Sequence, residues 1–141
     1  MPDSSQKSND KFTFHCYAPG DGAGGIHGWY DGLPGVVQGA IDAALEVLSN
    51  TRRSLWDERQ FGSLRGVCEG LSVVRFDIGE GKAKQAWRVL AFEGPGRRRI
   101  TLLYGFLEAS TEDYGPACHA AKQRMRGVIG DDGRAPPCEF P

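Results

Sequence analysis

Residues 71–107 decide the fold, and they read LSVVRFDIGEGKAKQAWRVLAFEGPGRRRITLLYGFL. The stretch contains three apolar runs, at residues 71–78, 86–92 and 99–107. Runs of this length that are rich in Val, Leu, Phe and Trp favour β-strands. The two connections, Gly79-Glu80-Gly81 and Gly94-Pro95-Gly96, are typical of hairpin turns. The stretch therefore predicts three strands in an antiparallel meander.

Amphipathic helices are expected before and after this meander. Pro34 suits a first helical turn, and apolar residues then recur at spacings of three and four. Beyond the meander, Ser110 and Asp113 form a capping-box pattern, and the apolar residues that follow again step by three and four. The sequence thus predicts helices over residues 34–49 and 111–128.

Two shorter patterns lie nearer the start of the chain. Residues 11–18 alternate apolar and polar side chains, which indicates a half-buried strand. Residues 55–64 contain enough large apolar side chains to bury a short second helix. We therefore expect an α+β fold, a small antiparallel sheet packed against one or more N-terminal helices and a C-terminal helix.

The chain of 141 residues has room for one domain with one core. We place this domain at residues 11–129. The polar residues 1–10 predict a disordered tail, and the proline-rich residues 130–141 predict a loose C-terminal segment.

The four cysteines are expected to be reduced thiols in a cytoplasmic protein. No apolar run approaches the roughly 18 residues that a membrane span needs, and residues 1–11 lack the apolar stretch of a signal peptide. No CxxC pair is present. His15-Cys16 and Cys118-His119 are potential zinc ligands, but adjacent side chains on a strand point to opposite faces, so we expect no metal site.

A glycine motif lies before the first predicted helix, in a context that does not suit nucleotide binding. Gly20, Gly22 and Gly25 spell GxGxxG after a predicted strand. Gly28 and Gly32 interrupt the helix that should follow, and the chain is too short for a doubly wound sheet. We therefore expect no nucleotide or other small-molecule cofactor.

The charge is unevenly distributed along the chain. The net charge is −1, which argues against broad coating of nucleic acid. Residues 79–100 nevertheless carry six basic residues and two acidic ones. This local excess is sufficient for a small anion-binding site.

Register within the meander brings basic residues together. If the first turn is centred between Gly81 and Lys82, Arg75 lies opposite Arg88, and a second turn centred on Gly96 places Arg88 opposite Tyr104. Two adjacent guanidinium groups repel each other unless an anion lies between or over them. The alternative is that each arginine pairs with a local acid such as Asp77 or Glu69 on a solvated face. A one-residue bulge would break the row.

Five short motifs in order resemble those of a known family. They are LRG at 64–66, GLSVVRF at 70–76, WRVL at 87–90, ITLLYGF at 100–106 and AAKQR at 120–124. Together they resemble the RelE/ParE toxin superfamily, and most closely its phage-derived HigB-like branch. The resemblance covers about residues 55–127.

The resemblance implies a fold, an activity and partners. The expected fold is a helix-rich N-terminal part over a small curved antiparallel sheet, closed by the last helix. Active relatives are ribosome-dependent mRNA endoribonucleases of type II toxin-antitoxin pairs, each held inactive by an antitoxin, and another arm of the superfamily poisons gyrase. Cleavage would proceed by attack of the ribose 2′-hydroxyl on the adjacent phosphate. Carried over by motif, the catalytic residues are Arg75, Arg88 and Tyr104.

The partners of such a protein would be ribosome-bound mRNA and an antitoxin, with no membrane. Its RNA-binding residues are expected to be Lys82, Lys84, Arg97, Arg98, Arg99, Lys122 and Arg124. The sequence departs from the family where Leu107-Glu108-Ala109-Ser110 replaces a lysine pair and a threonine. The alternative is therefore a non-catalytic, phage-derived RelE-like module that binds a partner protein.

Overall fold

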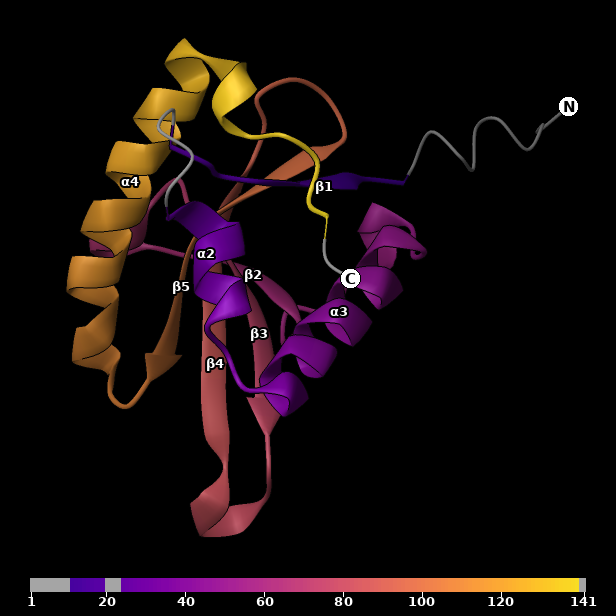
Figure 1. Cartoon of the computed structure of the whole chain (residues 1–141), viewed down its shortest axis with the longest axis vertical. Coiled ribbons are helices and arrows are strands. Elements are labelled where there is room, and N and C mark those ends of the chain that lie inside the picture. Colours follow the sequence, from indigo (N-terminus) through magenta and orange to yellow (C-terminus); the bar gives the residue numbers. More distant parts are fainter. Residues whose placement is uncertain (1–10, 20–23, 140–141) are drawn as a thin grey trace, which may run out of the picture.

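The computed structural model contains a five-stranded mixed sheet with helices on both faces (Figure 1). It describes residues 11–19 and 24–139, so the predicted tail at 1–10 lies outside the described residues, as do Gly20 and Gly22 of the glycine motif. The strands are β1 (Thr13–Cys16), β2 (Phe61–Ser63), β3 (Ser72–Ile78), β4 (Gln85–Glu93) and β5 (Arg99–Glu108). The helices are α2 (Gly25–Asp31), α3 (Gly35–Ser49) and α4 (Tyr114–Gly130).

The predicted meander is confirmed. β3, β4 and β5 are antiparallel neighbours in sequence order, within a sheet of order β1-β5-β4-β3-β2. The prediction of a purely antiparallel sheet is wrong, because β1 pairs with β5 in parallel. Between β1 and β5 the chain forms α2, α3 and strands β2 to β4. Parallel neighbours require such a long connection. The general α+β class holds.

The predicted helix at 55–64 is wrong. Helical structure there is limited to a 3₁₀ turn at Arg53–Leu55, and Phe61–Ser63 instead pairs with β3 as an edge strand. The indole N–H of Trp56 donates to the carbonyls of Leu48 and Thr51, both at 3.0 Å. Trp56 is therefore held against the end of α3, and the chain after it extends to reach the sheet.

The core has two parts, one on each face of the sheet. Successive strand residues point to opposite faces. Val74 accordingly packs in the cluster that contains α2 and α3, whereas Val73 packs in the cluster that contains α4. The predicted helices at 34–49 and 111–128 are thus both present, the second preceded by a 3₁₀ turn at Thr111–Asp113 that carries the predicted capping box.

Helix α2 packs on the sheet through a close contact between Trp29 and Gly105. Gly105 of β5 faces the indole ring of Trp29 on α2, and a Cβ at position 105 would overlap that ring. Trp29 also lies 6.3 Å from Trp87 of β4, measured between ring centroids. The glycine therefore allows a large aromatic side chain to lie flat against the sheet.

All four cysteines form disulfides, so the prediction of reduced thiols is wrong. Cys16 is bonded to Cys138 with a Cα–Cα distance of 5.0 Å, and Cys68 to Cys118 with 5.4 Å. The two pairs are separated by 122 and 50 residues in sequence. Spacing along the chain could not show this pairing, because tertiary folding brings the partners together.

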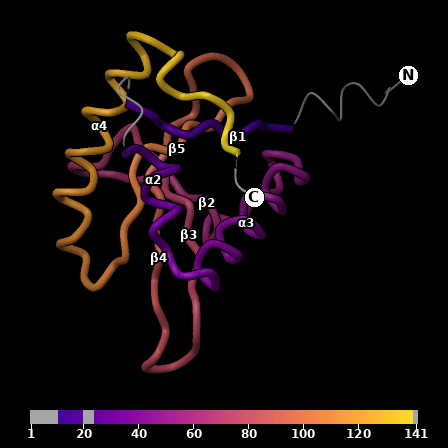
Figure 2. Tube along the Cα trace, in the orientation of Figure 1, coloured from indigo at the N-terminus to yellow at the C-terminus, as the bar shows by residue number. Residues whose placement is uncertain are grey.

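Residues 131–139, which follow α4, are anchored, in contrast to the loose segment predicted for 130–141, of which residues 140 and 141 lie outside the described residues. The Cys16 N–H donates to the Pro136 carbonyl at 2.9 Å, and the Cys138 N–H donates to the Phe14 carbonyl at 3.0 Å. Figure 2 shows this segment running beside β1. The C-terminal segment thus covers the free edge of β1, which protects an otherwise unpaired strand edge.

Within residues 11–19 and 24–139, no helix is long and apolar enough to cross a membrane.

Candidate functional site

The pairing of the two strand arginines is confirmed. Arg75 on β3 is the direct cross-strand partner of Arg88 on β4. Both point to the α4 face of the sheet, because they share the alternation of Val73 and Leu90, which pack in the α4 cluster. The first turn therefore has the centre that the sequence predicted.

The predicted position of Tyr104 is wrong. Arg88 lies opposite Phe106 on β5, and Tyr104 lies opposite Leu90. The register shifts between Leu90 and Ala91, at a β-bulge or similar irregularity. Tyr104 thus remains on the same face as Arg88, but one alternation further along the strand, about 7 Å away.

Arg88 is bound by two carboxylates. Its Nε donates to Glu108 Oε1 at 2.9 Å and one terminal nitrogen donates to Asp77 Oδ1 at 3.0 Å. Its side chain is only 12% exposed. Arg75 turns away from this pair and donates to the Glu58 carbonyl oxygen at 2.6 Å. Local pairing with Asp77, the alternative considered from the sequence, therefore describes Arg88 in this structure.

We define the Arg88 cluster as Asp77, Lys84, Arg88, Glu108 and Tyr114. Lys84 Nζ lies 3.2 Å from Asp77 Oδ2, and the Tyr114 hydroxyl hydrogen bonds with Glu108. Glu108 comes from β5 and Asp77 from β3, so the two carboxylates flank Arg88 from opposite sides. The four ionised side chains balance to zero net charge.

The surroundings shift the pKa values of three members. Burial lowers the pKa of the Arg88 guanidinium, but its hydrogen bonds with Asp77 and Glu108 outweigh burial and raise it. Burial raises the pKa of Asp77, but hydrogen bonds from Arg88 and Lys84 hold it below its usual range. Burial, followed by hydrogen bonding to Glu108, raises the pKa of Tyr114. Tyr114 is thus kept as a neutral hydroxyl beside a carboxylate.

A pocket of about 430 Å³ opens beside the cluster. It is lined by Glu58, Arg59, Arg75, Phe76 and Asp77. The pocket therefore connects Arg75 to the Asp77 side of Arg88. Arg88 itself does not line this pocket, because Asp77 lies between it and the opening.

Tyr104 belongs to a different local arrangement. The Arg124 guanidinium lies 5.3 Å from the Tyr104 ring centroid and 4.8 Å from that of Tyr17. Arg124 also donates to the Leu103 carbonyl at 2.8 Å. These contacts tie α4 to β5, so Arg124 has a structural role here.

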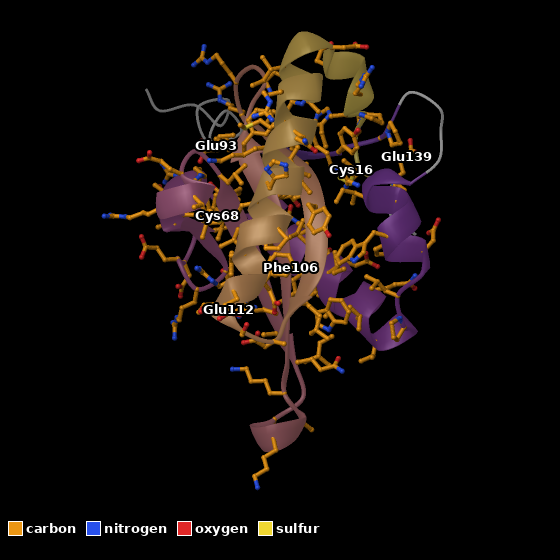
Figure 3. The ribbon with its side chains drawn as sticks, turned by 90° about the vertical axis from the view of Figure 1, so that its left-hand side faces the viewer. Cys16, Cys68, Glu93, Phe106, Glu112 and Glu139 are labelled. Atoms are coloured by element: carbon orange, nitrogen blue, oxygen red, sulfur yellow. A yellow bond between two sulfur atoms is a disulfide. The ribbon has the colours of Figure 1, made fainter. Side chains whose placement is uncertain are left out.

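The predicted RNA-binding residues fall in three places and do not form one surface. Lys82 and Lys84 lie at the β3–β4 connection, Lys122 and Arg124 lie on α4, and Arg97, Arg98 and Arg99 lie at the β4–β5 connection. In Figure 3, Glu93 at the β4–β5 end stands well apart from Phe106 and Glu112, which mark the Arg88 end. The predicted RNA-binding residues therefore lie on separate parts of the protein.

Sequence reasoning missed three members of the Arg88 cluster as site residues, namely Glu108, Tyr114 and Asp77, of which Asp77 was considered only as a local ion-pair partner. Glu108 shares the face of Phe106, the strand partner of Arg88, so its alternation was a usable signal. Tyr114 begins α4 and approaches only through the turn after β5. No signal in the sequence places it beside Glu108.

No three His, Cys, Asp or Glu side chains in the described part of the chain are grouped so as to hold a metal ion. The disulfides also occupy the sulfur atoms of Cys16 and Cys118, which were weighed as zinc ligands. Comparison with known proteins gives no match to a family model, a curated protein or a solved structure.

Proposed function

We propose that the chain is a RelE-like, toxin-type endoribonuclease that cleaves mRNA by attack of the 2′-hydroxyl on the adjacent phosphate. The observation that carries the proposal is the direct pairing of Arg75 with Arg88, with a carboxylate, Glu108, on Arg88. The order of elements, N-terminal helices, then a meander, then a last helix, agrees with the fold that the motif resemblance implies.

The Arg88 cluster supplies the groups that this reaction needs. The guanidinium groups of Arg75 and Arg88 stabilise the anionic phosphorane, since arginine stays charged and can bind two oxygens. Glu108 accepts the 2′-hydroxyl proton in place of Tyr104, which lies away from Arg88. The side chains of Glu108 and Asp77 are 21% and 38% exposed, so substrate can reach the cluster.

In this reaction Glu108 removes one proton and Lys84 supplies another, and the two residues lie on opposite sides of Arg88. The 2′-oxygen forms a bond to phosphorus as Glu108 takes its proton, and the bond from phosphorus to the 5′-oxygen breaks. Lys84, which lies on the Asp77 side of Arg88, donates a proton to that leaving oxygen. The products are a 2′,3′-cyclic phosphate and a 5′-hydroxyl end. Base and acid on opposite sides of the phosphate suit in-line displacement.

The partners and location belong to the same proposal. An antitoxin would hold the protein inactive, ribosome-bound mRNA would be its substrate, and the protein would act in the cytoplasm. That compartment keeps thiols reduced. The proposal therefore requires the fold to persist without the Cys16–Cys138 and Cys68–Cys118 bonds.

A second candidate is a non-catalytic RelE-like module that binds a partner protein. The observation that favours it is the zero net charge of the Arg88 cluster, in which both carboxylates already pair with Arg88. A phosphate must displace Asp77 before it can accept hydrogen bonds from the Arg88 nitrogen that Asp77 now occupies. Such fully paired networks also occur as purely structural features.

Regulated expression separates the two candidates. Wild-type protein is expected to arrest growth and to produce mRNA cuts with 5′-hydroxyl ends. Glu108→Gln keeps an acceptor oxygen for Arg88 but removes the base, so cleavage should fall by about 10²-fold or more. Glu69→Gln removes an exposed carboxylate elsewhere and should cleave as wild type does. Growth without arrest or cuts in wild type, with all variants folded, would refute the endoribonuclease and leave the binding module as the remaining candidate.

A further inference from the structure

A pocket at the β4–β5 connection is rich in arginine. It has a volume of about 660 Å³ and is lined by Phe12, Arg52, Arg53, Ser54, Glu93, Gly96, Arg97, Arg98 and Arg99. We call it the arginine pocket. Five positive charges meet one negative charge there, in a chain whose net charge is −1. Such a local concentration of one sign attracts ligands of the opposite sign.

Two arginines of the arginine pocket are held by contacts within the protein. The Arg53 guanidinium donates to Glu93 Oε1 at 2.6 and 3.0 Å and lies 4.9 Å from the Trp56 ring centroid. Arg99 donates to the Ala135 carbonyl at 2.7 Å. These contacts hold two of the arginines in place before any ligand arrives, which lowers the entropic cost of binding.

Two further arginines have their charges uncompensated. Among the described residues, no hydrogen bond or ion pair involves the side chain of Arg97 or Arg98. Glu93, the one acid among the described residues that line the pocket, is already bound to Arg53. The pocket therefore has cationic donors available for an added anion.

Arg98 also adopts a backbone conformation that favours glycine. Its φ is 55°, and it is the one non-glycine residue with positive φ in the described part of the chain. Long side chains in this region are uncommon and cost free energy, and such residues concentrate at functional sites. The nearby Gly96, in the same turn, also has a positive φ, of 85°. Position 98 therefore carries an arginine although glycine would be less strained there.

We infer that the arginine pocket binds two or more neighbouring phosphate groups, from a nucleic acid strand or from a free oligophosphate. Several guanidinium groups that converge on one hollow match the closely spaced oxygens of such a ligand. The side chain of Phe12 lines the same pocket and offers a flat surface beside the phosphates.

This site is distinct from the Arg88 cluster. Glu93 and Arg88 are five residues apart on β4, about 17 Å along the strand, and they alternate to opposite faces of the sheet. The arginine pocket lies on the α3 face, where Phe12 packs against Trp56. The inference therefore goes beyond the proposed cleavage activity and does not depend on it.

Binding of two phosphate probes tests the inference. Sodium triphosphate and an oligothymidylate of about eight nucleotides, which lacks 2′-hydroxyl groups, are titrated calorimetrically at about 50 mM salt. The pocket variant is R97Q/R98G, in which glycine relieves the positive φ, and R97Q alone is a second variant at an exposed position. The matched control is R65Q/R126Q, which removes the same charge from exposed positions outside the pocket.

Wild type and control should bind at least one probe, and the pocket variant should bind it at least about tenfold more weakly. If oligothymidylate binds the pocket more tightly than triphosphate does, the ligand is a nucleic acid strand. If triphosphate binds more tightly, the ligand is a free oligophosphate. The inference is overturned if wild type binds neither probe, or if the control loses as much affinity as the folded pocket variant.

Discussion

Arg75 and Arg88 stand directly opposite each other on β3 and β4, yet their guanidinium groups donate to different acceptors. Arg75 reaches outward to a carbonyl of the segment before β2, and Arg88 lies between the carboxylates of Asp77 and Glu108. Repulsion between neighbouring like charges is thereby offset without a bound anion. The proposed reaction requires this arrangement to open toward an RNA phosphate.

Removing Arg88 should destabilise the protein. Arg88→Ala leaves Asp77 and Glu108 without their shared donor, and we expect a loss of about 1–3 kcal/mol in the free energy of unfolding at neutral pH. Urea unfolding measures it, with exposed Arg126→Ala as the control. Unchanged stability in Arg88→Ala would show that the two carboxylates are sufficiently solvated to need no partner.

The effect of Arg88→Ala should also depend on pH. The folded-state pKa of Asp77 is lowered, so the stabilisation it provides is present above its unfolded value of about 3.9 and is lost as pH falls through the folded value. The difference between wild type and Arg88→Ala should therefore shrink below about pH 4. A difference that grows on acidification would contradict this assignment.

Local patterns predicted most elements and one strand register. The helices at α3 and α4 followed from three- and four-residue spacing, and the Arg75–Arg88 pairing followed from the position of one short turn. The predicted position of Tyr104 was wrong because no residue type in the sequence indicates the register shift between Leu90 and Ala91. A register inferred from a turn holds only as far as the first bulge.

Features that depend on tertiary folding could not be predicted. Cys16 and Cys138 are separated by 122 residues and meet because the chain after α4 returns to the edge of β1. Arg52, which follows α3, and Arg97, which lies in the β4–β5 connection, likewise line one pocket. Both pairs are obvious in the sequence as residue types, but their proximity is not.

Reduction should lower stability without abolishing the fold. Each disulfide restricts the unfolded chain, and we expect about 2–4 kcal/mol from each, with the larger effect from Cys16–Cys138 because it closes the longer loop. Urea unfolding with and without dithiothreitol measures the total. Cys16→Ser/Cys138→Ser and Cys68→Ser/Cys118→Ser separate the two contributions. Complete unfolding on reduction would contradict the proposed action in a reducing cytoplasm.

Tyr30 should titrate later than the other tyrosines. Burial, followed by its hydrogen bond to Asp42, raises the pKa of Tyr30 to about 12. The chain contains four tyrosines, and absorbance at high pH reports their ionisation. The component with the highest pKa should be absent in Tyr30→Phe. Persistence of that component would assign it to another tyrosine.

The same shift predicts a loss of stability at high pH. Because the folded-state pKa of Tyr30 is raised, its stabilising contribution is fully present below the unfolded value of about 10 and is lost as pH rises toward 12. Wild type should therefore lose more stability than Tyr30→Phe between about pH 10 and 12. Equal losses in the two proteins would show that Tyr30 ionises equally easily in the folded and unfolded states.

Gly105 and Trp29 should be energetically coupled. Gly105→Ala adds a Cβ that overlaps the Trp29 indole, so we expect a loss of about 1–3 kcal/mol in urea unfolding. In a Trp29→Ala background the obstacle is gone, and the same substitution should cost much less. Gly39→Ala is the control, since a Cβ there meets nothing within 4 Å inside α3 and should stabilise by about 0.5–1 kcal/mol. Equal costs of Gly105→Ala in both backgrounds would show that backbone conformation, and not the Trp29 ring, requires glycine at this position.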